Sequence, residues 1–276
     1  HNLALCSDGT LAAWGAGGRG KLGYGDVSDR RLPVAVDQTG ALAGKRVVAI
    51  SAGYDTSLAL CSDGTLFTWG GNQYGQLGDN TGADRNVPAA VDPNGVLSGR
   101  IVTAISSGDA HHLALCSDGT LATWGWNYSG QLGDGTQTDS RVPVLVARTG
   151  VLSGKEVVSA AACGSQNLCL CSDGTLVAWG YNGSGQLGNG GNSNSKVPVA
   201  VTLTGILSGK SVSRISVGSG HCLASCSDGT LAAWGLNSSG QLGDGSVITR
   251  KAPVAVDRSG FLSDKKTVAE SAGNSH

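Results

Sequence analysis

One hexapeptide, Cys-Ser-Asp-Gly-Thr-Leu, occurs five times in this chain at a constant step of 55 residues. The same step relates five Trp-Gly pairs and five prolines, without an insertion or deletion, and five steps span all but one of the 276 residues. A period of this length indicates small units that bury their apolar surface by stacking on their neighbours. The hexapeptides begin at Cys6, Cys61, Cys116, Cys171 and Cys226.

The second unit shows what one repeat contains. It has four apolar runs rich in strand-forming residues, at 47–52, 58–61, 66–70 and 87–91. An Asp-Gly pair between the second and third runs is typical of a tight hairpin, because glycine accepts the positive φ of such a turn. Pro88 lacks an N–H, so the fourth run is predicted to be an edge strand. One unit is therefore a four-stranded sheet with two apolar faces, and it cannot bury both alone.

Stacking such sheets radially and closing the ring would bury both faces and remove the open edges. We predict an all-β fold: a β-propeller of five four-stranded blades, forming one domain over residues 1–276. The chain starts inside a unit, at Leu3-Ala4-Leu5, and finishes with Thr267-Val268-Ala269, the strand that precedes that position in the period. We expect the N- and C-terminal strands to pair and close the ring. The alternative is an open slice of a longer array.

The motifs resemble the repeats of the regulator-of-chromosome-condensation family. The third unit carries the family's Gly-x-x-His run at 108–115, its Asp-Gly turn at 118–119, its Trp-Gly at 124–125 and its Gly-Gln-Leu-Gly at 130–133. The resemblance covers essentially the whole chain, with local departures such as Lys21 in place of Gln. It implies a propeller that binds other proteins through one face, and one known role of the family is nucleotide exchange on small GTPases. Familiar members have seven blades, whereas this chain has five units.

Charge excludes some classes of partner. The chain has 19 Lys and Arg against 20 Asp and Glu, for a formal net charge of −1. Such a balance gives no general attraction to nucleic acid or to an anionic membrane. No run approaches the roughly 20 apolar residues of a membrane span. We therefore expect another protein as partner, no nucleic acid, no membrane span, and a monomer if the ring closes. The cellular location is not predicted.

The eight cysteines divide into a regular and an irregular set. Five occupy one repeat position, and equivalent positions on separate blades lie too far apart for a disulfide. We expect these five to be small buried hydrophobic residues. Three others, Cys163, Cys169 and Cys222, fall outside the pattern, and their oxidation state is left open.

Residues that commonly carry catalysis or bind metals follow the repeat. Four histidines share one position, where Thr56 or Gln166 stands in other units, which favours a structural role over a metal ring. The turn aspartates have equivalent environments, whereas acid–base catalysis needs carboxylates in different ones. We therefore predict no catalytic activity, no cofactor and no metal. The two sets are His1, His111, His221 and His276, and Asp8, Asp63, Asp118, Asp173 and Asp228.

The positions that vary between units are candidates for binding. The first variable stretch follows Trp-Gly, and the repeat places all five copies on one face of the disc. Exposed Tyr and Trp side chains favour recognition because they bury a large area at a small entropic cost. The alternative is that they only cover the loop of the adjacent blade. The candidate binding residues are Arg19, Tyr74, Trp126, Tyr128 and Tyr181.

Basic residues recur at a second repeat position, just before the first apolar run of a unit. They could meet phosphate or an acidic protein, although such charges usually form a solvated face. The function that we predict is a non-catalytic protein-interaction scaffold that presents one loop face. Alternatives are an exchange factor for a small GTPase, a structural module of a repetitive surface or extracellular protein, and a glycan binder. This basic set comprises Lys45, Arg100, Lys155, Lys210 and Lys265.

Overall fold

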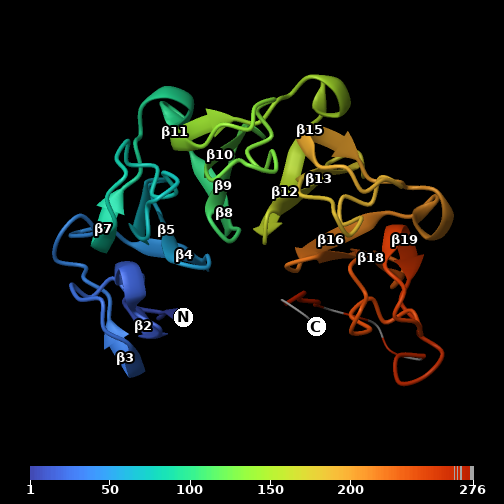
Figure 1. The fold of residues 1–276 in the computed structure, drawn as a ribbon, viewed down its shortest axis with the longest axis horizontal. Coiled ribbons are helices and arrows are strands. Elements are labelled where there is room, and N and C mark those ends of the chain that lie inside the picture. Colours follow the sequence, from blue (N-terminus) through green and yellow to red (C-terminus); the bar gives the residue numbers. More distant parts are fainter. Residues whose placement is uncertain (264, 266, 268, 274–276) are drawn as a thin grey trace. The chain divides into compact units, whose positions relative to one another are not determined.

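The computed structural model describes residues 1–263, 265, 267 and 269–273. Its strands form five antiparallel sheets (Figure 1). By their internal contacts the residues divide into two compact units, residues 1–128 with 136–146 and residues 129–135 with 147–276. The all-β fold built of repeated sheets is confirmed. The single propeller domain over residues 1–276 stays a prediction.

The first unit holds three sheets, in each of which strands that follow one another in the chain are neighbours. Short 3-10 helices lie at Gly18–Gly20 (η1) and Gly95–Leu97 (η2). The strands are β1 (Asn2–Leu5), β2 (Leu11–Gly15) and β3 (Arg30–Ala35); β4 (Val47–Ala52), β5 (Thr56–Cys61), β6 (Leu66–Gly70) and β7 (Arg85–Ala90); and β8 (Val102–Ser107), β9 (His111–Cys116), β10 (Leu121–Gly125) and β11 (Ser140–Leu145).

The second unit repeats this order in two sheets. Its 3-10 helices are Gly150–Leu152 (η3) and Gly205–Leu207 (η4). Its strands are β12 (Val157–Cys163), β13 (Gln166–Cys171), β14 (Leu176–Gly180) and β15 (Ser195–Ala200); and β16 (Val212–Val217), β17 (His221–Cys226), β18 (Leu231–Gly235) and β19 (Arg250–Ala255).

The Asp-Gly hairpins form as predicted. In the β5–β6 turn, Gly64 has φ +82° and its N–H donates to Cys61 O at 2.9 Å. The Asp63 carboxylate accepts the Thr65 N–H at 3.0 Å, which fixes the turn from the side-chain side. The proline strand is also confirmed as an edge strand, because β7, which contains Pro88, lies at the end of its sheet.

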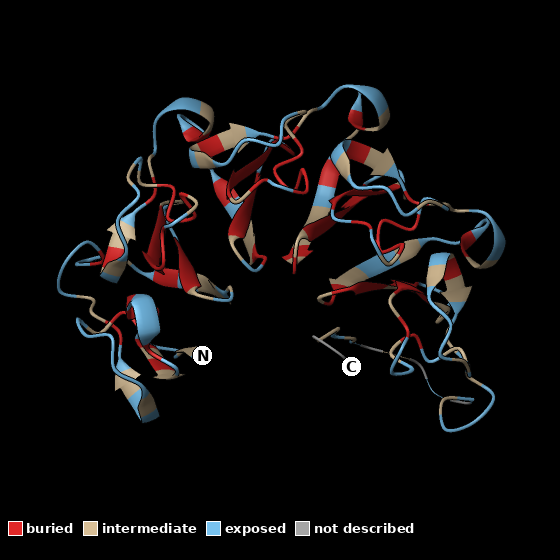
Figure 2. Cartoon of the chain, in the orientation of Figure 1, coloured by how far each residue is buried: buried red, intermediate tan, exposed pale blue. Residues whose placement is uncertain are grey.

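Burial follows the position of each strand in its sheet. The two middle strands β5 and β6 are buried along their whole length, whereas the outer strand β7 alternates between exposed and buried residues (Figure 2). Both faces of the middle strands are therefore covered by neighbouring sheets, as expected for stacked units.

A repeated contact in each unit inserts a tryptophan into a loop that precedes its sheet in the chain. Trp69 is fully buried and its Nε1–H donates to Lys21 O at 3.0 Å. A Cβ on Gly23, which has φ +73°, would lie 2.6 Å from that Nε1, so only glycine fits below the ring. We call this carbonyl and glycine a tryptophan socket. Three more are filled in the same way: Gln76 and Gly78 hold Trp124, Gln131 and Gly133 hold Trp179, and Gln186 and Gly188 hold Trp234.

The first sheet differs from the others in having three described strands, β1, β2 and β3. The strand predicted to complete it, Thr267–Ala269 in the sequence, includes Val268, which lies outside the described residues. Residues further along lie against β16 and the turn after it, where the Ala272 N–H donates to Ser216 Oγ at 2.8 Å and the Ser219 N–H to Gly273 O at 3.2 Å. Pairing of the N- and C-terminal strands stays a prediction.

The regular cysteines are free thiols, and Cys61, Cys116, Cys171 and Cys226 are buried as expected. Cys6 is exposed, contrary to the prediction. It lies on the same face as Trp14, the face that in the next sheet is covered through the Trp69 socket. The cysteine therefore has the same place in each sheet, but whether its thiol is buried depends on the neighbouring sheet.

Candidate protein-interaction surface

In the four sheets that have four strands, the loop after the third strand is held from inside by a buried asparagine. In the loop between β6 and β7, Asn72 Nδ2 donates to Thr81 O at 3.2 Å and to Ala83 O at 3.1 Å, and Asn72 Oδ1 accepts the Leu77 N–H at 3.0 Å. Asn127 repeats this in the loop between β10 and β11, where its Nδ2 donates to Thr138 O at 3.0 Å. Because these internal bonds fix the loops, the residues beside each asparagine can face outward.

Three predicted aromatic residues of the first unit lie together on these loops. The Tyr74 and Trp126 ring centroids are 5.7 Å apart and tilted by 35°, and Trp126 stacks on Tyr128 at 6.3 Å and 9°. Tyr128 is 71% exposed, whereas Tyr74 and Trp126 are half-buried. We call Tyr74, Trp126 and Tyr128 the aromatic surface. Tyr74 and Trp126 come from successive sheets, so part of their area covers the neighbouring loop and the rest is available to a partner.

Tyr181 belongs to the second unit and is 42% exposed. A Cβ on Gly183 would lie 2.2 Å from the Tyr181 hydroxyl oxygen, so this ring lies over its own loop. Its part in a common binding surface stays a prediction.

Arg19 lies across the start of the next loop, since a Cβ on Gly71 would be 2.8 Å from Arg19 Cδ. Its guanidinium lies between two carboxylates, 3.6 Å from Asp55 Oδ2 and 3.5 Å from Asp84 Oδ2. The backbone of Arg19 adopts φ +63°, which is uncommon for a residue with a side chain. Lys21 Nζ also contacts Asp55, at 2.6 Å. Arg19 therefore joins two loops, and its contact with a partner stays a prediction.

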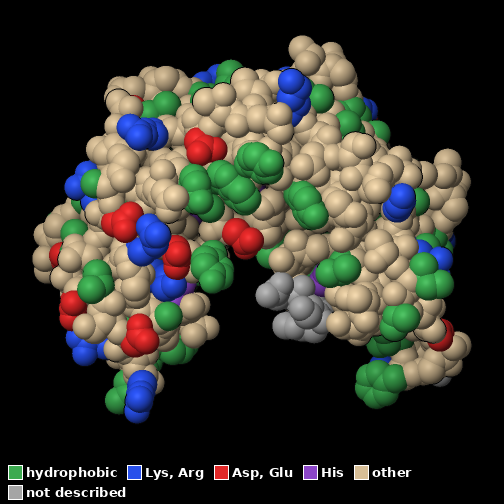
Figure 3. Space-filling model, viewed as in Figure 1, with side chains coloured by type: hydrophobic (Ala, Val, Ile, Leu, Met, Phe, Trp, Pro, Cys, Tyr) green, Lys and Arg blue, Asp and Glu red, His purple; other side chains and the backbone are tan. Residues whose placement is uncertain are grey.

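A pocket of about 330 Å³ lies beside the aromatic surface, with Tyr74 shared between the two. Arg19, Tyr54, Asp55 and Asp109 also line it. Figure 3 shows hydrophobic side chains gathered beside acidic and basic ones on the face that it presents. The pocket thus combines aromatic rings with carboxylates.

The charge of this pocket is not fully compensated. Arg19 and Lys21 lie against Asp55 and Asp84. In the described part of the chain the Asp109 carboxylate has no hydrogen-bond or ion-pair partner. Asp109 lines the pocket, and partial desolvation raises the pKa of its carboxyl. The pocket therefore offers one uncompensated negative charge to a cationic group.

Sequence reasoning missed Tyr54, Asp55 and Asp109, which lie in the turns between the first two strands of their sheets. A signal was present. The turn position of Tyr54 is occupied in other units by Asp109, Gly164 and Ser219, so it varies as much as the stretch after Trp-Gly. The turns were overlooked because each variable segment is only two residues long.

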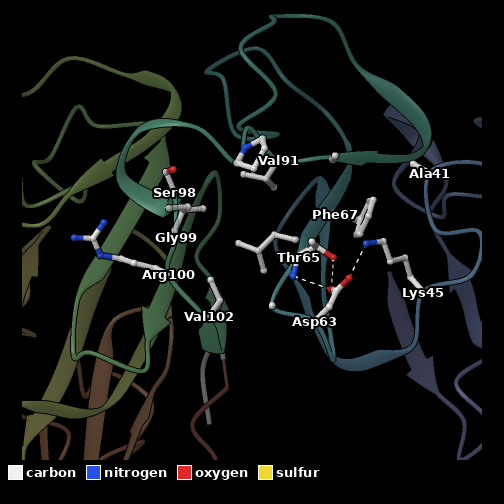
Figure 4. A pocket seen from close by; sticks show the side chains of 15 residues that line it. Ala41, Lys45, Asp63, Thr65, Phe67, Val91, Ser98, Gly99, Arg100 and Val102 are labelled. Carbon is white, nitrogen blue, oxygen red and sulfur yellow. Dashed lines mark hydrogen bonds and ion pairs between the residues drawn. The ribbon is translucent and has the colours of Figure 1, made fainter.

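A larger cavity of about 490 Å³ lies between the β5–β6 hairpin and η2 in the first unit (Figure 4). Its charged groups are paired, with Lys45 Nζ 2.6 Å from Asp63 Oδ2 and Arg100 Nε 3.1 Å from Asp118 Oδ2. Its floor includes Phe67, in a unit where Ala41 replaces the Val, Ile or Phe of other units. Because these charged groups are already paired, the described residues that line the cavity offer no uncompensated charge to a ligand.

The basic residues that precede the first strand of a sheet have a structural explanation as well. Lys45, Arg100, Lys155 and Lys210 each contact the aspartate of the following hairpin turn. The Lys155 ammonium, followed by hydrogen bonds from Thr175, lowers the pKa of Asp173 to about 2. These cations therefore pair with the hairpin turns of their own sheets.

The described residues contain no group of three His, Cys, Asp or Glu side chains that could hold a metal ion. Of the histidines, His112 is buried, with Nδ1 2.8 Å from Ser107 Oγ, and burial lowers its pKa to about 3. Within the same described ranges no helix has the length and apolar character needed to cross a membrane.

Comparison with known sequences gives a consistent family. A family model described as RCC1-like domain matches residues 1–276. The ultraviolet-B receptor UVR8 of Arabidopsis thaliana is 35% identical over 278 residues, which cover 100% of this chain and 60% of the receptor. The E3 ubiquitin-protein ligase HERC2 of Homo sapiens is 34% identical over 259 residues, covering 93% of this chain and 5% of the ligase. The chain thus spans 60% or less of these relatives.

Solved structures show the same fold. Human WBSCR16 matches with a TM-score of 0.83 and 27% identity, covering 99% of this chain and 67% of that one. Prp20p of Saccharomyces cerevisiae, whose structure was described together with its binding to Gsp1p and histones, matches with a TM-score of 0.77 and 22% identity, covering 99% and 64%. At 22% identity the second likeness is evidence of the fold alone.

Proposed function

The chain belongs to the RCC1-like domain family, and from this premise we propose that it is a non-catalytic protein-interaction module that binds its partner through the aromatic surface. The observation that carries the proposal is the stack of Tyr74, Trp126 and Tyr128 on loops that buried asparagines already hold in place. A surface whose supports are internal is rigid before binding, so little entropy is lost when a partner docks.

The neighbouring pocket supports a partner of particular chemistry. An apolar residue would cover the Trp126–Tyr128 stack, and a cationic side chain beside it would meet Asp109 between Tyr54 and Tyr74. Arginine suits such a place best, because its planar guanidinium stacks on aromatic rings and pairs with carboxylates. The described residues contain a contact of this kind, with Arg30 Cζ 4.5 Å from the centre of the Tyr24 ring. The partner segment would therefore carry an arginine next to an apolar residue.

The test uses substitutions that the repeat itself tolerates. In a triple variant, Tyr74→Ser, Trp126→Leu and Tyr128→Ser, each new residue stands at the equivalent position of another unit. The matched control is Leu32→Ala, which removes a side chain that is 76% exposed on β3 and introduces the residue that the fifth unit has there. Proteins captured with the wild-type chain, together with purified histones and Gsp1p, would be titrated against all three proteins by calorimetry.

We expect the triple variant to weaken binding of a genuine partner at least about tenfold, which is typical of removing interface aromatic residues. The control should bind as the wild type does. Asp109→Asn should weaken binding by a smaller factor, since it removes one charge and keeps the shape. Unchanged affinity of the triple variant for every partner would overturn the proposal.

Nucleotide exchange on a small GTPase, glycan binding and a structural role in a repetitive array stay predictions from the sequence. No described feature of the loop face favours one of them over protein binding. Exchange has a direct test, since the chain would have to accelerate release of a labelled nucleotide from Gsp1p.

A further inference from the structure

The cavity between the β5–β6 hairpin and η2 lies where two side chains are short at once (Figure 4). Ala41 and Pro93, from the loops before and after the sheet, both line it. A proline side chain closes back on its own backbone nitrogen, so it does not reach across the space as a longer one does. At the position of Pro93 the other units have Gln38, Arg148, Leu203 and Arg258. At the position of Ala41 they have Val96, Val151, Ile206 and Phe261.

The longer side chains show which chemical group this place accepts. In the first sheet, Gln38 Nε2 donates to Gly9 O at 3.1 Å, and Gln38 Oε1 accepts the Leu11 N–H at 3.1 Å. In the last sheet, Arg258 Nη1 donates to Gly229 O, the equivalent carbonyl. A planar N–H group therefore lies on the hairpin carbonyl in both sheets, and the carboxamide also accepts an N–H from the strand that follows.

The second sheet has the same backbone groups without such a side chain. Gly64 and Leu66, the equivalents of Gly9 and Leu11, both line the cavity. Among the described residues no side chain donates to Gly64 O, and none accepts the Leu66 N–H. A carboxamide has a donor for the first group and an acceptor for the second, whereas a guanidinium has donors only. The cavity therefore matches a carboxamide better than a cation.

The rest of the lining suits a neutral ligand with an apolar body. Leu66, Phe67 and Val91 are each 4% exposed, and Phe67 brings an aromatic ring where other units have Ala or Val. The charged side chains are occupied: Arg100, already in an ion pair, also donates from Nη1 to Val96 O at 2.6 Å. The volume of about 490 Å³ falls within the range of roughly 300–1,000 Å³ that is usual for small-molecule sites.

We propose that this cavity is a binding site for a primary carboxamide on an aromatic body. The carboxamide donates to Gly64 O and accepts the Leu66 N–H, as Gln38 does for the equivalent groups of the first sheet. The ring packs against Phe67, where an aromatic pair gains more than its buried area alone. The cavity shares no lining residue with the aromatic surface or the pocket beside it, and the proposal does not depend on the proposed function.

The experiment uses benzamide as the probe and two-dimensional amide NMR of the 276-residue chain. The reporter is the Leu66 amide, which should shift downfield as it gains an acceptor. The equivalent Leu121 amide of the next sheet is the internal reference and should not shift. A second probe, N-acetylglutamine methylamide, carries the same group on an aliphatic stem and represents the side chain of a partner protein.

Two variants close the cavity with residues that the repeat already uses. Pro93→Gln introduces the residue of the first sheet, so that the chain supplies its own carboxamide. Ala41→Val narrows the cavity from the opposite loop with the residue of the third unit. The matched control is Asn94→Thr, which changes the neighbour of Pro93 to the residue of the first sheet. Thr39 there bonds the preceding aspartate through its side chain, as Asn94 does.

We expect saturable binding of benzamide with a Kd on the order of 1 mM, as for a ligand with few atoms. Pro93→Gln should weaken binding at least about tenfold and Ala41→Val about threefold, because both take up space that the ligand needs. Asn94→Thr should bind as the wild type does. N,N-dimethylbenzamide, which lacks the N–H donors, and benzamidine, which lacks the acceptor, should each bind at least about fivefold more weakly than benzamide.

The variant Pro93→Gln also has a readout without any probe. Its Leu66 amide should already show the downfield shift that benzamide causes in the wild type, and a spectrum that is otherwise unchanged shows that the variant is folded. Absence of a saturable Leu66 shift in the wild type up to about 30 mM benzamide would overturn the proposal. Wild-type affinity in both Pro93→Gln and Ala41→Val would overturn it too. Tighter binding of benzamidine or of the glutamine probe than of benzamide would overturn the aromatic carboxamide as the ligand.

Discussion

The first and second sheets of the chain contain the same residues at key positions and bury them differently. Trp69 is 0% exposed and Cys61 is 1% exposed, whereas their equivalents Trp14 and Cys6 are half-buried and exposed. The strands and hairpin turns of the two sheets are alike, so the local sequence does not cause the difference. The second sheet is covered through a filled socket, and the same face of the first is not covered in the described structure. Burial in this fold is therefore a property of the contact between two sheets.

The largest effect that separates the two sheets should come from the tryptophans. We expect Trp69→Ala to lower the free energy of unfolding by about 3–5 kcal/mol, because it removes a fully buried ring and leaves the Lys21 carbonyl with one donor fewer. Trp14→Ala should lower it by less than about half as much. Urea unfolding of both variants measures this. Equal losses would mean that another sheet covers Trp14 in solution.

The reactivity of the two equivalent thiols, Cys6 and Cys61, tests the same comparison without a substitution. Cys6 should react with a maleimide at least about a hundredfold faster than Cys61, since a protected thiol reacts only through an opening that costs about 3 kcal/mol or more. Burial also raises the pKa of Cys61, which lowers its thiolate fraction. Mass spectrometry of the labelled chain, with Cys116 as a second buried reference, gives both rates. Protection of Cys6 to the level of Cys61 would instead support the predicted pairing of the terminal strands.

The loops of the two sheets differ in their internal support. Asn72 stands where the first sheet has Gly17, whose backbone N–H is held only by Asp29 Oδ1 at 2.9 Å. We expect Asn72→Ala to destabilise its loop by about 1–3 kcal/mol, because several buried groups lose their partner at once. Hydrogen exchange of the Leu77 amide, which donates to Asn72 Oδ1, would report it. Exchange in the Asn127 loop should stay unchanged, and a spread of the effect to that loop would contradict local support.

The smallest effect should be on acid stability. Hydrogen bonds from Lys45 and then Thr65 lower the pKa of Asp63, whereas the pKa of Asp8 is lowered mainly by the Thr10 N–H and hydroxyl. A carboxyl whose pKa is lowered by folding stabilises the protein above its unfolded pKa of about 4, and this stability is lost as the pH falls below that value. Asp63→Asn should therefore flatten the fall in urea midpoint between pH 5 and pH 2 more than Asp8→Asn. The reverse order would show that the lysine contributes less than the turn itself.

Much of the architecture was predictable because each repeat encodes its own strands. The Asp63-Gly64 hairpin and the edge position of the Pro88 strand followed from backbone rules that act within a few residues. The exposure of Cys6 was not predictable, since it depends on the neighbouring sheet. The loop-face pocket was predicted only in part. Tyr74 came from a visible variable stretch, whereas Asp109 lies in a two-residue turn and meets it through packing of separate sheets.

The filled sockets are built from the same parts, so the packing itself does not specify which sheet follows which. Only the covalent connection between successive repeats sets their order. During refolding a sheet can seat its tryptophan in the wrong socket with nearly native contacts, and such errors are the characteristic traps of repeat proteins. The same interchangeability has an evolutionary side: a gene can gain or lose one whole 55-residue unit by recombination, and every remaining interface still finds its matching surface.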